Sequence, residues 1–108
     1  MSDRRDRLRK VLADLVDGSY PVVLGCREVA TLASGMDIER RFLDLFVMVD
    51  SETESLHIGP EAMLWSEDER RSSAAKADRY GEVVRGEVVA AARQLLQELE
   101  ERDPSLRG

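Results

Sequence analysis

Apolar residues near the start of the chain recur at the spacing of one face of an α-helix. A stripe at positions i, i+3, i+4, i+7 and i+8 is formed by Leu8, Val11, Leu12, Leu15 and Val16. Ser2 or Asp3 provides an N-cap, and Gly18 supplies the residue that ends many helices in a left-handed conformation. The pattern predicts a first helix that ends at Gly18.

A second run, VVLGCREVATLAS at residues 22–34, also repeats small or apolar residues at helical spacing. These residues are Val22, Cys26, Val29, Ala30 and Ala33. We predict a second helix that ends before Gly35. The adjacent Val22 and Val23 and the interior Gly25 are contrary evidence, because both features weaken a helix and suit a short strand.

The third run admits two interpretations. Asp37 is a candidate N-cap for a helix whose apolar positions are Ile38, Phe42, Leu45, Phe46 and Val49. Phe46 to Val49 taken alone is an apolar run that also suits a strand. We predict a helix over Ile38 to Phe46, and a small hairpin around the turn-prone SETES is the alternative to helix for Val47 to Ile58.

The last helix is predicted to be the longest. Ser66 and Glu69 have capping-box spacing, strong helix formers continue to Arg102, and Pro104 stops the pattern. Its stripe is Ala77, Tyr80, Val84, Val88, Ala91, Leu95 and Leu99. The steps do not keep the strict seven-residue repeat of a coiled coil, so we expect this helix to pack on a core.

Residues 67–102 as one straight helix would measure about 54 Å at about 1.5 Å per residue. A compact domain of this size is only about 34 Å across. Either the helix bends or breaks near Ser72 and Ser73 or near Gly81, or a second copy of the chain covers the overhanging part. We favour a kink or break, and leave a homodimer as the alternative.

The chain is long enough for one hydrophobic core. It has 108 residues, of which 43% are hydrophobic and 35% charged, and such a chain folds as a single domain. We predict one mainly α domain over residues 1–108, with about four helices and a short irregular or β-hairpin segment around residues 47–59. A small α+β domain is the alternative.

The protein is acidic throughout. Its formal net charge is −6, and residues 1–54 and 55–108 each hold 8 basic and 11 acidic side chains. We therefore predict no nucleic-acid partner, and the RRDRLRK string at residues 4–10 is interpreted as a solvated helix face. With no signal-peptide core and no apolar run of about 18 residues, we predict no membrane partner. Cys26, the only cysteine, is expected to be a small buried hydrophobe in a cytoplasmic protein.

The densest polar cluster is DSETES at residues 50–55. If that segment were extended, Asp50, Glu52 and Glu54 would point to one side and form an oxygen cage for Mg²⁺ or Ca²⁺. The calcium-binding loop pattern is rejected, because Ser55 stands where its sixth position requires glycine. A solvated turn is the favoured interpretation. His57 is taken as structural, and we assign no catalytic residue, metal or cofactor.

Trp65 is the only tryptophan and closes the segment GPEAMLW. Tryptophan often anchors an interface with another protein. The favoured interpretation, however, is a core plug packed against the long helix.

The segment FVMVDSETESLHIG, followed by Trp65, resembles the central stretch of a family of small bacterial proteins. In that family an Asp-Ser-Glu-Thr segment leads to a tryptophan and a long C-terminal helix. His57 departs from the pattern, where proline is expected. The resemblance implies a domain outline and carries no activity or site.

The sequence therefore favours a small acidic protein-interaction module over an enzyme. The expected partner is another protein or a second copy, bound through the long helix and a surface that includes Asp50, Glu52, Glu54 and Trp65. The alternative is a metal-assisted or carboxylate-dependent enzyme centred on Asp50, Glu52, Glu54 and His57.

Overall fold

The first helix, α1, spans Asp3–Asp17, as its apolar stripe predicts. The computed structural model describes residues 3–56 and 65–102. Gly18 ends α1 with a φ of 84°. Its N–H donates to the Leu15 carbonyl at 3.3 Å, and the Ser19 N–H donates to the Asp14 carbonyl at 3.0 Å. These two bonds form a Schellman motif, which satisfies carbonyl groups at the helix end.

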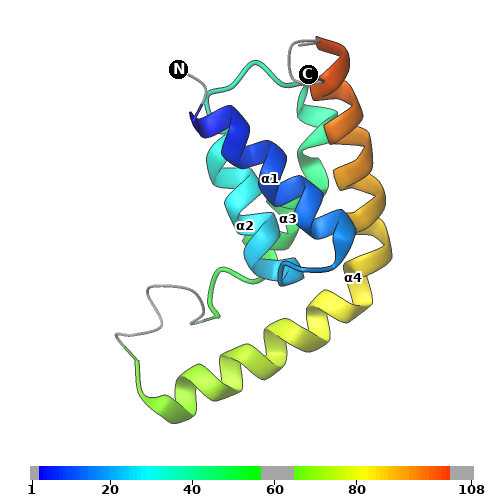
Figure 1. Ribbon diagram of the computed structural model, residues 1–108. Helices are drawn as coiled ribbons and strands as arrows, with labels where there is room; N and C mark the ends of the chain where they lie inside the picture. Colours follow the sequence, from blue (N-terminus) through cyan, green and yellow to red (C-terminus); the bar gives the residue numbers. More distant parts are fainter. Residues whose placement is uncertain (1–2, 57–64, 103–108) are drawn as a thin grey trace.

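The second helix, α2, spans Val22–Ala33 and runs antiparallel to α1 (Figure 1). At one end of this pair Arg4 donates to the Ser34 carbonyl at 3.2 Å. Further along, Gly25 packs so closely on α1 that a Cβ atom there would lie 2.9 Å from the Cγ of Leu15. The glycine that argued against a helix is therefore the residue that lets the two helices approach.

The third helix, α3, spans Asp44–Glu52 and follows a single 3₁₀ turn, η1, at Arg40–Phe42. The helix predicted over residues 38–46 is therefore placed too early. Residues 47–52, where a hairpin was the alternative to helix, are helical, and the described residues contain no strand. The reason is burial: Phe46 and Val49 are both 0% exposed. Residues three apart share a helix face but point to opposite faces of a strand.

The fourth helix, α4, spans Glu67–Arg102. Its start is capped as predicted, because the Glu69 N–H donates to Ser66 Oγ at 3.2 Å. The helix is continuous but bent, and the bend falls in the yellow part of the ribbon (Figure 1). The molecule measures 46 Å along its longest principal axis, less than the length of a straight helix of this size. The predicted kink is therefore found as a bend, with no break near Ser72 and Ser73.

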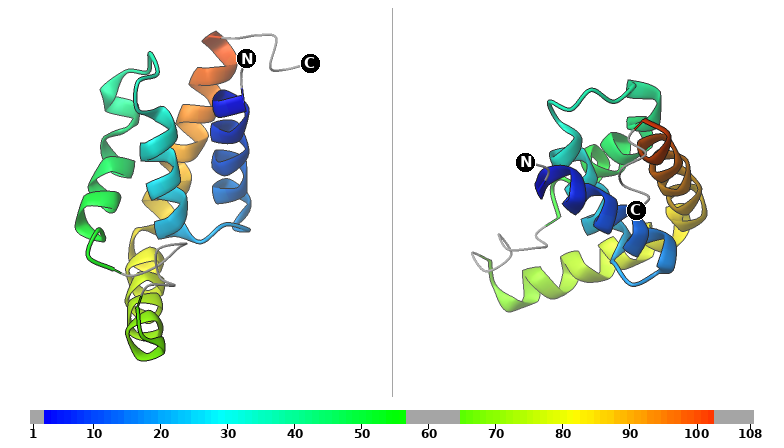
Figure 2. Two further views of the ribbon diagram at one scale, coloured as in Figure 1. Left: turned by 90° about the vertical axis from the view of Figure 1, so that its left-hand side faces the viewer. Right: turned by 45° about the horizontal axis from the view of Figure 1, so that its top comes forward.

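The two halves of α4 have different surroundings. The C-terminal half lies along the other helices, whereas the N-terminal half passes below them, as the side view in Figure 2 shows. Near the bend a Cβ atom on Gly81 would lie 3.2 Å from the Cβ of Val22 in α2. Ala92 is buried, whereas Ala91 is only half-buried. The buried face of α4 therefore includes Ala92 in place of the predicted Ala91.

The core lies between α1, α2, α3 and the C-terminal half of α4. Its fully buried apolar side chains are Leu8, Leu12, Cys26, Val29, Phe46, Val49, Val88, Ala92 and Leu95. All four helices contribute to this one cluster. The described part is thus mainly helical, and the α+β alternative is not needed.

In residues 3–56 and 65–102 we find no helix with both the length and the apolar character needed to span a bilayer.

Candidate functional site

The carboxylates of the acidic segment do not converge. Asp50 and Glu52 lie in the last turn of α3, where residues two apart point about 200° away from each other around the helix axis. Asp50 forms an ion pair with Arg27 at 3.7 Å, whereas Glu52 accepts a hydrogen bond from the hydroxyl of Tyr80. Glu54 is exposed. The extended arrangement on which the oxygen-cage hypothesis depended is wrong for residues 50–52.

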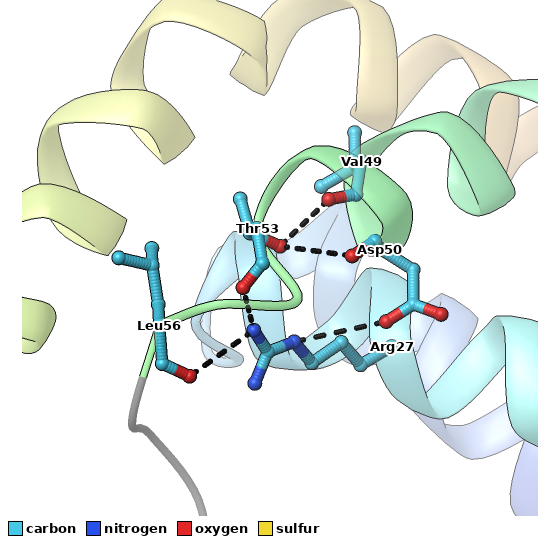
Figure 3. Close-up of polar contacts among 5 residues, drawn as sticks. All are labelled: Arg27, Val49, Asp50, Thr53 and Leu56. Carbon is cyan, nitrogen blue, oxygen red and sulfur yellow. Dashed lines mark hydrogen bonds and ion pairs between the residues drawn. The ribbon is translucent and has the colours of Figure 1, made fainter.

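Arg27 is the polar centre at this end of α3 (Figure 3). Its side chain is only 14% exposed, and its guanidinium donates to the carbonyl of Thr53 and, at 3.3 Å, to that of Leu56. Carbonyl groups at a helix C-terminus carry partial negative charge, which a guanidinium offsets. Arg27 is therefore a helix-capping residue, and the polar cluster around it stabilises the fold.

No role for Arg27 was predicted from the sequence, although one signal was present. Among residues 22–33, which form α2, Arg27 and Glu28 are the only charged residues. A long cation in an otherwise apolar short helix needs an acceptor, because burying an unpaired charge is costly. The identity of that acceptor depended on the placement of α3.

Tyr80 connects α4 to the end of α3. The hydrogen bond to the Glu52 carboxylate, followed by burial, raises the pKa of the Tyr80 hydroxyl to about 12. A carboxylate that accepts this bond favours the protonated phenol. The contact joins the N-terminal half of α4 to α3 close to the bend.

The remaining candidate residues have separate surroundings. Cys26 is 0% exposed, and burial raises the pKa of its thiol to about 12, which confirms the prediction of a small buried hydrophobe. Trp65 is 44% exposed, so the prediction that it fills a space in the core is wrong. This residue lies just before the start of α4 and is not part of the core cluster. His57 lies outside the described residues. Among those residues no group of three or more histidine, cysteine, aspartate or glutamate side chains is placed to hold a metal ion.

A concavity lies between the α1–α2 connection and the N-terminal half of α4, and we call it the α4 groove. It is open to solvent and has a volume of about 790 Å³. Its apolar lining on the α1–α2 side includes Leu15, Tyr20, Pro21, Val22, Val23 and Leu24. Its lining on α4 consists of the small residues Ala74, Ala77 and Gly81 and the charged residues Arg70, Asp78, Glu82 and Arg85.

Three of the charged side chains that line the α4 groove are exposed, those of Asp78, Glu82 and Arg85. Arg85 pairs with Glu82 at 3.4 Å, and its guanidinium lies so close to Gly18 that a Cβ atom there would be 2.8 Å from Arg85 Nη2. The groove thus has an apolar lining on the α1–α2 side, and small residues and charged residues of both signs on the α4 side. The groove was not predicted from the sequence, because it is formed by two segments about 50 residues apart in the chain.

Comparison of the chain with protein-family models, with curated proteins and with solved structures gave no match.

Proposed function

We propose that this protein is a small acidic interaction module that binds an α-helix of a protein partner in the α4 groove. The observation that carries the proposal is the groove itself, an open concavity of about 790 Å³ with an apolar lining on the α1–α2 side. A groove with an apolar floor and a polar rim is one of the recurring ways in which proteins bind helices. The cytoplasm is the proposed compartment, since the sequence has one cysteine and that cysteine is buried.

Small side chains on one wall of the groove favour a helical partner. Ala74, Ala77 and Gly81 leave the backbone of α4 close to the groove. Helices pack with their axes about 8–10 Å apart, and short side chains permit the lower end of that range. The apolar residues opposite, such as Leu24, offer contact area for a longer apolar side chain of the partner.

The groove includes the long helix of the surface predicted from the sequence, but not the acidic residues of that surface. Asp50, Glu52 and Glu54 lie at the end of α3 and are not part of the groove lining. Their contact with a partner, and that of Trp65, stays a prediction. The geometry gives no added support to a carboxylate-dependent enzyme, because Asp50 and Glu52 are bonded to different groups.

Photo-crosslinking tests the proposal. A p-benzoyl-phenylalanine replacing Ala74 places the reactive group in the groove, and the same residue replacing the exposed Arg79 places it on another side of α4. We expect an adduct from position 74 and little from position 79. The crosslinked peptide, sequenced by mass spectrometry, should come from a helical segment. Equal yields at both positions, or none at position 74, would contradict the proposal.

A further inference from the structure

Asp78 brings an unpaired negative charge to the α4 side of the groove. Its side chain lines the groove and is exposed. Within residues 3–56 and 65–102 this carboxylate has no ion pair and no hydrogen bond. The described lining residues of α1, α2 and their connection are all uncharged. None of them therefore offers a cation to Asp78 from across the groove.

The neighbours of Asp78 along α4 leave its charge in place. Side chains three or four positions apart are neighbours on the surface of a helix. Around Asp78 these positions hold Ala74, Ala75, Gly81 and Glu82. Three of these residues are small and uncharged, and the fourth carries the same sign as Asp78. No side chain at these positions can therefore form an ion pair with Asp78.

The two arginines that line the groove have interactions of their own. Arg85 forms an ion pair with Glu82 at 3.4 Å. Arg70 is half-buried, already has a partner other than Asp78, and lies about two helical turns before it. The charge that the described part of the groove leaves for a bound molecule is therefore negative.

We propose that Asp78 makes the α4 groove selective for a helix that carries a lysine or an arginine at the edge of its apolar face. This inference rests on the function proposed above and states the chemistry of its partner. Ala74 and Gly81 lie one turn to either side of Asp78 and leave room for the aliphatic stem of such a residue. The stem then packs on the groove while its charged end reaches the carboxylate.

The charge of the whole chain acts in the same direction. The net charge of −6 attracts a basic helix and speeds its encounter with the protein. At physiological ionic strength this attraction is screened beyond about 8 Å. The choice between two helices that reach the groove therefore depends on the contact with Asp78. A carboxylate of the partner at that place would meet like charge, which lowers affinity.

A displayed peptide library tests this selectivity. Each peptide is helical and has a stripe of leucine, and the positions at the edges of the stripe are randomised. Selection on the wild type should enrich lysine and arginine at one edge position. Asp78→Asn should abolish the enrichment, whereas Glu87→Gln should retain it. Glu87 is the matched control, because this exposed carboxylate of α4 is not part of the groove lining.

The affinities of one selected peptide distinguish a direct contact from a structural role. The basic residue of the peptide is replaced by glutamine, and fluorescence anisotropy measures both peptides against the wild type and Asp78→Asn. Asp78→Asn should weaken the basic peptide by about 5-fold or more, and the glutamine peptide by less than about 2-fold. Asp78→Lys should prefer a third version of the peptide, with glutamate at the same position.

Each outcome decides for or against the role of Asp78. Equal weakening of the basic and glutamine peptides would overturn it, and so would a library that enriches no basic residue. Circular dichroism checks that Asp78→Asn is folded, and Asp78→Ser is the second variant if it is not.

A crosslink from p-benzoyl-phenylalanine at position 74 separates the two proposals. Peptides that crosslink there but bind independently of Asp78 keep the proposed function and overturn only its selectivity. A library that yields no peptide with this crosslink overturns the helix-binding groove, and the role of Asp78 with it.

Discussion

Arg27 and Thr53 lie 26 residues apart in the chain, and the guanidinium of Arg27 donates a hydrogen bond to the backbone carbonyl of Thr53. The bond joins the middle of α2 to the end of α3. Thr53 is itself held by its hydroxyl, which donates to the Val49 carbonyl at 2.6 Å. The end of α3 is thus fixed from outside by a cation and from within by a side-chain hydroxyl.

Replacing Arg27 should destabilise the protein. Arg27→Met keeps the length of the side chain and removes its bonds to the carbonyls, so we expect a loss of about 2–3 kcal/mol in the free energy of unfolding. Arg27→Lys should recover only part of it, because an ammonium group lacks the planar fork of donors. Urea denaturation measures both. The exposed Arg93 is the control, and Arg93→Met should change stability by less than about 0.5 kcal/mol.

Alanine substitutions at two glycines should change the stability of the protein in opposite directions. Gly25→Ala forces a methyl group against Leu15, and overpacking of this kind costs about 1–3 kcal/mol, more than the gain in helix propensity of about 1 kcal/mol. Gly86 has nothing within 4 Å of the position of a Cβ atom. Gly86→Ala should therefore stabilise the protein by up to about 1 kcal/mol. Thermal unfolding of both variants checks the signs, and a stabilised Gly25→Ala would show that α1 and α2 are not in close contact.

The bond between Tyr80 and Glu52 should be visible in the titration of the phenol. With the pKa of Tyr80 raised to about 12, its ultraviolet phenolate signal should appear late as pH rises. Glu52→Gln removes the carboxylate, and the pKa of Tyr80 should then fall toward the usual value of about 10. The measurement is made in a Tyr20→Phe background, so that Tyr80 is the only tyrosine. An unchanged midpoint in Glu52→Gln would show that Glu52 does not accept this bond.

Cys26 should make the protein less stable at high pH. Its thiol has a pKa of about 12 in the folded protein against an ordinary value of 9.0, so the unfolded chain loses this proton first. The stabilising contribution is complete below about pH 9 and is lost as pH rises from there toward 12, at about 1.4 kcal/mol per pH unit.

The Cys26→Ala variant isolates this effect. It should be less stable at neutral pH because it leaves a small cavity, but its stability should fall less steeply than that of the wild type above pH 9. Parallel slopes would contradict the assignment. In the native wild type a thiol reagent should react with Cys26 only after unfolding, since the side chain is 0% exposed.

The sequence alone determined the ends of those helices that are capped by residues next to them in the chain. Gly18 ends α1 and Ser66 caps α4, as expected, because both effects act within one turn of the chain. The apolar stripe of α1 correctly predicted which face of the helix is buried, because apolar residues recur at the helical period on the face that packs against the core. The burial of Cys26 followed from its chemistry in the same way.

Tertiary contacts decided the features that depend on residues far apart in the chain. The apolar run at Phe46 suits a strand or a helix by pattern alone, and its packing in the core made it part of α3. The partner of Arg27 and the groove below α1 and α2 both depend on residues 20 or more positions apart. Periodicity records which side of an element is apolar, but it holds no information on which other element will cover that side.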